Sequence, residues 1–316
     1  MTTFTLGERE IRDAVPMNEA IDAVRRGFLD LAAGEFEMPT RTALRDGQFL
    51  VMSAHHRPTA SAMIKTLSVN FGRTPAIAGS VVWSETGRPD QLVATAGTVT
   101  ALRTGAAVGV ATDLLARPGA ARLTLIGAGG QAPDQIRAVH AVRPLRRLTV
   151  VDTDPRRAET LVETVQSELP GVELRTASDA ESAVGDAEIV CCATSATAPL
   201  FPASALPERV HVNAIGAYRP TMRELPAELL ADSAVVVDEL GAVLEESGEV
   251  IHALGAGVLT EDALTELGTA LAPPSAAAPS SGARLAEATG RTVFKTVGVA
   301  VQDWAVARLL ADKFLP

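Results

Sequence analysis

The pattern of apolar and polar positions changes about a third of the way along the chain. After a short strand expected at 4–6, apolar residues recur at helical spacing from Ile21 to Leu31, which predicts an amphipathic helix ended by Gly34. The pattern then becomes that of strands separated by Gly, Pro, Asp and Asn turns, expected at 49–54, 63–71, 78–83 and 91–94. A helix expected at 98–115 follows. This part is predicted to be an α+β unit with a mostly antiparallel sheet.

From residue 119 onward, strands alternate with helices, which predicts βαβ crossovers and a doubly wound parallel sheet of the Rossmann type. The strands are expected at 123–126, 148–151, 172–175, 189–193, 210–215 and 234–237, and the helices at 131–142 and 156–168. An Ala/Pro/Ser-rich segment, 270–283, is expected to be a surface loop. An amphipathic helix is expected at 294–310. The predicted domains are 1–118, joined by the C-terminal helix 294–316, and 119–293.

Composition narrows the class of protein. The 316 residues are 47% hydrophobic and only 3% aromatic, and the net charge of −10 argues against binding to nucleic acid or to an anionic membrane. The acidic excess lies in the second part, where no Lys or Arg occurs from Glu224 to Ala283. Cys191 and Cys192 are adjacent, which fits neither a disulfide framework nor a metal site, so we expect buried thiols in a cytoplasmic protein. No signal peptide, membrane span or bound metal is expected.

A glycine-rich loop follows the first strand of the second part. The residues Gly127-Ala128-Gly129-Gly130-Gln131-Ala132 form a G-x-G-x-x-A pattern between a predicted strand and a predicted helix. Such a loop lets the backbone approach a pyrophosphate, which the helix N-terminus attracts. Asp152, after the next strand, is placed to bind a ribose diol and to repel a 2′-phosphate. This predicts NAD as the cofactor, with NADP kept open by Arg156 and Arg157.

Other cofactor contacts are expected where neighbouring strands end, because ligands of doubly wound sheets bind beyond the carboxyl ends of the strands. These positions are Thr153, Arg157, Thr194, Ser195, Ile215 and Gly216. Tyr218 and Arg219 follow them, and we expect these two at the rim of the substrate pocket. Taken alone, the loops after these strands could equally be ordinary turns.

Three basic residues of the first part stand in or beside apolar segments: Arg41, Lys65 and Arg103. Two guanidinium groups and an ammonium can clamp a carboxylate. Lys65 is notable because 25 of the 28 basic residues are Arg, and an ammonium loses its proton far more readily than a guanidinium when buried. The simpler interpretation of each residue alone is a charge that reaches the surface.

In combination, several segments resemble the ornithine cyclodeaminase/mu-crystallin family over nearly the whole chain. The matching segments are Met38-Pro-Thr-Arg41-Thr, Lys65 on its strand, Thr100-Ala-Leu-Arg103-Thr-Gly-Ala-Ala, Ile126-Gly-Ala-Gly-Gly-Gln131-Ala132, Val212-Asn213-Ala-Ile-Gly216-Ala, Arg223-Glu224-Leu225, Glu246-Ser-Gly-Glu-Val250 and Thr292-Val-Phe-Lys295-Thr-Val-Gly298. The resemblance implies a homodimer joined through the sheet of the first domain and a domain that binds NAD(P). It also implies an amino or imino acid whose carboxylate meets Arg41, Lys65 and Arg103, and it places Lys295 near the cofactor.

Two departures from the family pattern favour one activity within it. Relatives that resemble true ornithine cyclodeaminases carry a Glu where Leu50 stands here and an Asp where Tyr218 stands. The resemblance assigns those acids to the amino groups of the substrate, so their absence favours reduction of a cyclic ketimine carboxylate such as Δ1-pyrroline-2-carboxylate. Lys65 is then the candidate proton donor to the imine nitrogen. The alternatives are an ornithine or lysine cyclodeaminase with catalytic NAD, a simple amino-acid dehydrogenase, and a mu-crystallin-like binding protein without turnover.

Overall fold

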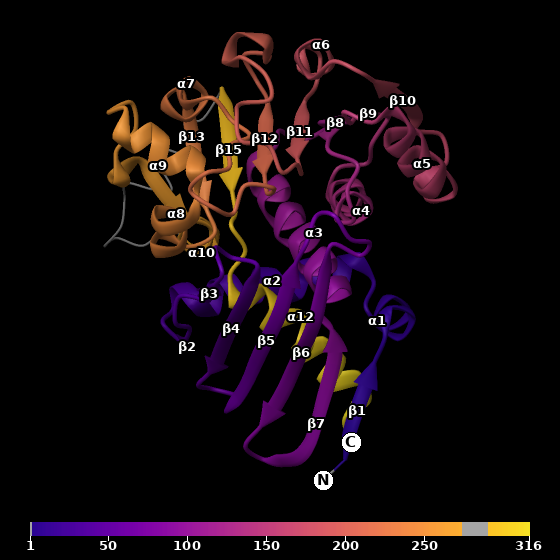
Figure 1. Cartoon of the computed structure of the whole chain (residues 1–316), viewed down its shortest axis with the longest axis vertical. Helices are drawn as coiled ribbons and strands as arrows, with labels where there is room; N and C mark the ends of the chain where they lie inside the picture. The colour runs from indigo at the N-terminus through magenta and orange to yellow at the C-terminus, as the bar shows by residue number, and fades with distance from the viewer. Residues whose placement is uncertain (1, 274–289) are drawn as a thin grey trace. The chain divides into compact units, whose positions relative to one another are not determined.

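The computed structural model describes residues 2–273 and 290–316, which form two compact units. Unit 1 consists of residues 1–110 and 299–316, and unit 2 of residues 111–298. Figure 1 shows the elements of both. None of the helices in these described ranges is long and apolar enough to cross a bilayer.

Unit 1 is built on a seven-stranded sheet with the order β1-β7-β6-β5-β4-β2, in which β3 also pairs with β4. The pair β1 and β7 is parallel and the other pairs are antiparallel. The strands are β1 (Thr3–Leu6), β2 (Phe36–Glu37), β3 (Thr42–Leu44), β4 (Phe49–His56), β5 (Ser61–Val69), β6 (Ile77–Glu85) and β7 (Arg88–Thr95). The helices are α1 (Glu8–Ala14), α2 (Met17–Ala32), α3 (Ala96–Leu115), whose last turn belongs to unit 2, and α12 (Ala300–Phe314).

The core of unit 1 lies between the sheet and α12, which packs on β4, β5 and β6 and also on α2 (Figure 1). Alternate residues of β5 are buried, as expected for a strand with one face on a core, and Lys65 occupies one of these inward positions between Met63 and Leu67. The alternation of side chains along β5 therefore places the Lys65 ammonium in an otherwise apolar layer.

Unit 2 is a parallel sheet of eight strands with the order β10-β9-β8-β11-β12-β15-β13-β14. The strands are β8 (Arg122–Ile126), β9 (Arg147–Val151), β10 (Glu173–Ala177), β11 (Ile189–Cys192), β12 (His211–Ala214), β13 (Ser233–Val237), β14 (Leu264–Glu266) and β15 (Arg291–Lys295). The helices are α4 (Ala132–Val142), α5 (Pro155–Val165), α6 (Ala180–Val184), α7 (Ala227–Ala231), α8 (Leu240–Glu246), α9 (Gly248–Gly255) and α10 (Leu267–Leu271), with 3-10 turns at Gln166–Glu168, Ala203–Ala205 and Glu261–Ala263. The predicted α/β fold class and doubly wound sheet are confirmed.

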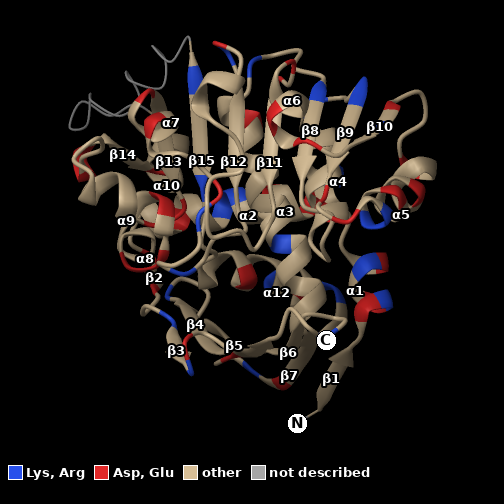
Figure 2. Cartoon of the chain, turned by 45° about the horizontal axis from the view of Figure 1, so that its top comes forward, with Lys and Arg blue, Asp and Glu red and all other residues tan. Residues whose placement is uncertain are grey.

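Local sequence explains where the helices of unit 2 begin. Asp154 caps α5 because its side chain accepts a hydrogen bond from the Arg156 backbone N–H, and Pro155 fits the first helical turn. Charge is arranged unevenly around this sheet: β8, β9 and β15 each begin with an Arg, whereas α7 to α9 carry acidic side chains and no Lys or Arg (Figure 2).

The prediction of one helix over 294–310 is wrong. Residues Arg291–Lys295 form β15, a central strand paired with both β12 and β13, and α12 begins only at Ala300. A strand buried on both faces lacks the period of two that marks a half-exposed strand, and here every residue from Thr292 to Lys295 is buried. Gly298, with φ of +86°, separates strand from helix.

The structure also bears on the surface loop expected at 270–283 and on the two cysteines. Residues 270 and 271 belong to α10, and 274–283 of the predicted surface loop lie outside the described residues. Cys191 and Cys192 are free and buried in β11, as predicted, and burial raises the pKa of the Cys191 thiol to about 12. These thiols act as small apolar side chains of the sheet.

Candidate functional site

The glycine loop of unit 2 lies where the order of the sheet reverses. Strands β9 and β10 continue from one side of β8, and β11 and β12 from the other, so the carboxyl ends of β8 and β11 bound the position at which such sheets bind ligands. Gly127 follows β8 with φ of +101°, and a Cβ there would come within 2.5 Å of the Ala193 carbonyl oxygen after β11. Only glycine fits this contact between the two loops.

The rest of the loop leaves its backbone accessible. A Cβ at Gly130 would have no other atom within 4 Å, and one at Gly129 would meet only the Arg157 guanidinium, at 3.8 Å. Ala132 begins α4 and donates its N–H to the Gly129 carbonyl at 2.9 Å, and Pro133 has no N–H, so the attraction for an anion here comes from the helix dipole. A pyrophosphate fits here because small residues give it room and the helix N-terminus attracts an anion.

The glycine loop after β8 helps to hold the Asp152 side chain in place. Its carboxylate accepts hydrogen bonds from the backbone N–H of Ala128, at 2.7 Å, and of Asp154, at 2.9 Å. The side chain is half-buried at the end of β9, and its neighbours Thr153 and Arg157 are exposed. A fixed anion beside a dinucleotide loop suits a ribose diol and disfavours a 2′-phosphate.

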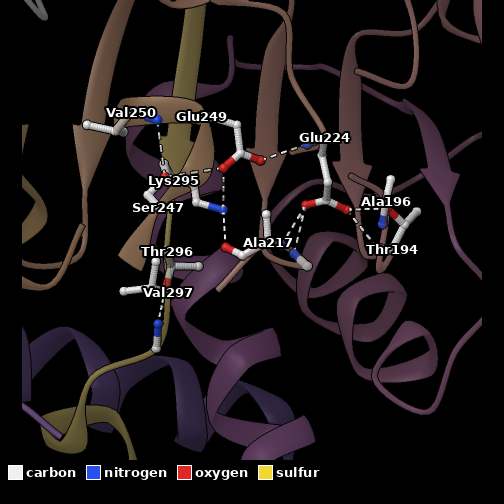
Figure 3. A network of polar contacts seen from close by, with 12 residues as sticks. Thr194, Ala196, Ala217, Glu224, Ser247, Glu249, Val250, Lys295, Thr296 and Val297 are labelled. Atoms are coloured by element: carbon white, nitrogen blue, oxygen red, sulfur yellow. Dashed lines mark hydrogen bonds and ion pairs between the residues drawn. The ribbon is translucent and has the colours of Figure 1, made fainter. Parts of the chain in front are cut away.

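Behind these loops, buried acidic side chains tie the carboxyl ends of β11, β12 and β15 together (Figure 3). Glu224 accepts hydrogen bonds from the backbone N–H groups of Thr194, at 2.6 Å, and Gly216, at 2.8 Å, and from the Thr194 hydroxyl, at 2.9 Å. Burial raises the pKa of Glu224. Glu224 therefore fixes two of the predicted cofactor positions, Thr194 and Gly216.

The network continues to Lys295. The Glu249 carboxylate accepts from the Glu224 backbone N–H at 2.9 Å and lies 3.2 Å from Lys295 Nζ. Lys295 also donates to the Ala217 carbonyl at 2.6 Å, and its side chain is fully buried (Figure 3). Lys295 thus supports the loop that carries Gly216, while its predicted contact with the cofactor stays a prediction.

Asp238 closes the same edge of the sheet. Its carboxylate accepts hydrogen bonds from the Thr296 hydroxyl and from the backbone N–H groups of Val297 and Gly298, at 2.5, 3.0 and 2.8 Å, and burial raises the pKa of Asp238.

The remaining positions predicted to contact the cofactor or the substrate differ in exposure. Ser195 is exposed, whereas Ile215 is buried. Tyr218 and Arg219 are half-buried and contact each other, with the guanidinium 4.9 Å from the ring centroid.

Unit 1 brings Lys65 and Arg103 together on a single carboxylate. Lys65 Nζ donates to Asp303 Oδ1 at 2.8 Å, and Arg103 Nε lies 3.3 Å from the same oxygen. Arg103 also donates through Nη1 to the Gln302 side chain. The side chains of Lys65 and Asp303 are fully buried and that of Arg103 is 6% exposed.

This cluster contains more positive than negative charge. Burial lowers the pKa of Lys65 to about 8; Asp303 raises that pKa, and the charges of Arg103 and Arg41 lower it further. Arg41 therefore lies within electrostatic reach of Lys65 and is itself half-buried. Two buried cations that share one carboxylate form a strong site for an anionic ligand.

Sequence reasoning missed Asp303, Gln302, Glu224, Glu249 and Asp238. The signal for Asp303 and Gln302 was available, since these two residues interrupt an otherwise apolar run on α12.

Another cluster of polar side chains consists of Asp30, Glu35 and His56, whose carboxylate oxygen and imidazole nitrogen atoms lie within 4.8 Å of one another. His56 Nδ1 bonds to the Thr59 hydroxyl and Nε2 faces both carboxylates, so an imidazole between two acids accounts for this group without an ion.

Substituting Lys295 with Met should lower the free energy of unfolding by about 3–5 kcal/mol, because Glu249 would be left as a buried charge without its partner. The matched control is Lys313→Met, which removes an exposed ion pair with Glu19 and should cost less than about 1 kcal/mol. Urea unfolding followed by circular dichroism measures both. Equal losses in the two variants would contradict the structural role of Lys295.

Comparison with known proteins agrees with the predicted resemblance. The model of the ornithine cyclodeaminase/mu-crystallin family matches residues 2–316. A Δ1-pyrroline-2-carboxylate reductase of Bacillus cereus is 31% identical over 98% of this chain and 96% of its own length. An L-lysine cyclodeaminase of Streptomyces rapamycinicus is 36% identical over 78% of this chain and 77% of its own length.

A solved structure has the same fold over its full length. The Thermococcus litoralis Δ1-pyrroline-2-carboxylate reductase, in complex with NADH and L-proline, superposes with a TM-score of 0.89 at 29% identity, covering 99% of this chain and 97% of that one. From the family match and these likenesses we conclude that the chain belongs to the ornithine cyclodeaminase/mu-crystallin family.

Proposed function

We propose that the protein reduces a cyclic ketimine carboxylate, such as Δ1-pyrroline-2-carboxylate, to the cyclic amino acid with NADH. The observation that carries this proposal is the buried cluster of unit 1, in which Lys65 and Arg103 share Asp303. Since one carboxylate cannot neutralise both Lys65 and Arg103, the cluster suits the carboxylate of a small substrate.

Each part of the chain then has a distinct task. Arg41, Lys65 and Arg103 hold the substrate carboxylate, which orients the ring. Lys65 supplies the proton to the imine nitrogen, and its lowered pKa of about 8 suits a general acid at neutral pH. In unit 2, the glycine loop holds the pyrophosphate and Asp152 the adenosine ribose. The nicotinamide, when bound, supplies the hydride.

The inner face of unit 1 favours a reductase over a cyclodeaminase. Leu50 is buried two residues before Met52, and Met52 lies directly opposite Lys65 in the sheet. An acid at position 50 would share this face with Lys65, but a leucine gives nothing to bind a distal amine. The Bacillus and Thermococcus reductases support the same choice.

The second candidate is a lysine or ornithine cyclodeaminase, which the 36% identity to the Streptomyces enzyme favours. Such an enzyme would release ammonia from the diamino acid without net consumption of NAD. A binding protein without turnover has less support, because it does not call for a proton donor at Lys65. A simple amino-acid dehydrogenase would use such a donor in the same way and differs in taking an acyclic substrate.

The reductase proposal predicts oxidation of NADH with Δ1-pyrroline-2-carboxylate or its six-membered homologue, and no ammonia from ornithine or lysine. Lys65→Met should lower kcat/KM by at least about 100-fold, because the proton donor and one carboxylate ligand are lost together. It should leave NADH binding, measured by cofactor fluorescence, unchanged, and Lys313→Met should behave as the unaltered protein. Ammonia release with unchanged total NADH would instead establish the cyclodeaminase.

Cofactor choice is tested at Asp152. We expect NADH to be preferred, and Asp152→Asn to raise the ratio of kcat/KM for NADPH to that for NADH by about tenfold, since the repulsion of a 2′-phosphate is removed. Asparagine keeps an oxygen for the Ala128 N–H, so the loop is retained. Asp154→Asn, two residues along, is the control. An unaltered ratio in Asp152→Asn would speak against ribose recognition by this carboxylate.

We further propose that two copies associate through the outer face of the unit 1 sheet. Four of its large apolar side chains are exposed: Leu44, Phe49, Val51 and Ile64. Leu44 lies opposite Phe49 between β3 and β4, and Ile64 lies opposite Val82 between β5 and β6. Several large apolar side chains exposed on one face of a sheet are typical of a protein interface, and the family resemblance supports a homodimer.

Ile64→Glu should therefore convert a dimer to a monomer, because it places a charge within the apolar face. Light scattering after size-exclusion chromatography measures the mass. Val258→Glu, which alters an equally exposed residue of unit 2, should leave the dimer intact. A monomeric unaltered protein, or a dimer in both variants, would contradict this interface.

A further inference from the structure

Asp303 is the acid that Lys65 and Arg103 share in unit 1. It reaches Lys65 from α12, whereas Lys65 lies on β5 and Arg103 on α3. The chain separates Lys65 from Asp303 by 238 positions, yet both side chains are fully buried and in hydrogen-bond contact. Their pairing is thus a product of the tertiary fold.

The surroundings of Lys65 oppose its charge in every other respect. Its directly opposed neighbours across the sheet are Met52 on β4 and Val81 on β6, whose side chains offer an ammonium only the weak acceptor sulfur of Met52. Burial, Arg103 and Arg41 favour the neutral amine, whereas Asp303, which accepts a hydrogen bond from Lys65 Nζ at 2.8 Å, favours the ammonium. Among the described residues, Asp303 is therefore the main support for the proton on Lys65.

The Asp303 carboxylate has few other hydrogen-bond partners among the described residues. Asp303 Oδ1 is shared by the two cations, and no donor among the described residues reaches Oδ2. A buried carboxylate that accepts so few hydrogen bonds depends on its ionic partners for stabilisation, so Asp303 and the two cations stabilise one another.

We propose that Asp303 is a positioning residue, which keeps Lys65 protonated at neutral pH and holds it beside Arg103 for the substrate carboxylate. The catalytic part of this inference rests on the reductase function proposed above. The electrostatic part does not, because it concerns only the contacts within unit 1.

The three lysines of the chain make a direct test practical. Labelling with [ε-13C]lysine gives three NMR signals, from Lys65, Lys295 and Lys313, and Lys65→Met identifies the first. In the unaltered protein we expect the Lys65 signal to titrate near pH 8, and in Asp303→Asn to titrate lower by about one unit or more. The other two signals should not move. Asp312→Asn, an exposed acid on the same helix, is the matched control.

Activity gives an independent readout. The alkaline limb of the profile of kcat/KM against pH should move down by the same amount in Asp303→Asn, because the amine is then neutral over more of the range. KM for the imine should rise, and Asp303→Glu, which restores the charge, should return both towards the unaltered values. A residue needed only for stability would not shift the profile.

Two results would overturn the proposal: an unchanged Lys65 titration in Asp303→Asn or in the smaller Asp303→Ser, or a Lys65 signal that titrates below pH 7 in the unaltered protein. The second result needs no variant to fold. If the unaltered protein fails to oxidise NADH with cyclic imines, the reductase function fails, while the NMR titration still decides the role of Asp303.

Discussion

The buried ionic contact of Lys65 and Arg103 with Asp303 is the constraint on which the rest of unit 1 depends. Charges cannot be taken out of water unless partners and hydrogen bonds replace the water. Here β5, α3 and α12 supply them, so the packing of these three elements also sets the charge of the site. The excess of positive charge that remains is what a carboxylate ligand would neutralise.

In unit 2, buried carboxylates fix the loops at the carboxyl ends of the sheet. The loops after β11, β12 and β15 have few side chains of their own to fix them, and buried acids bind their backbone N–H groups instead. Glu224 and Asp238 each accept from two or more successive loop positions, and their pKa values are raised by burial. The acids that give the second half of the chain its negative charge thus include the supports of its loops.

Several features of the fold and of the cofactor site could be predicted from the sequence because each depends on neighbouring residues. The glycine loop, Asp152 and the order of strands and helices each depend on residues close together in the chain. The partners of Lys65 and Lys295 could not be predicted in this way. Asp303 and Glu249 are distant in sequence, and an acid in an apolar helix gives no indication of which cation it meets. The misplaced helix over 294–310 has a related cause, since a strand buried on both faces carries no period.

The rarity of lysine now has a physical explanation. An arginine at position 65 or 295 would stay charged however deeply it was buried, and its planar group would need several acceptors. Lysine needs fewer acceptors, and at position 65 burial brings its pKa to about 8, within reach of proton transfer. At position 295 the same side chain meets a carboxylate and a carbonyl and acts as a support. One residue type therefore serves two purposes, and the balance of charges around each ammonium decides which.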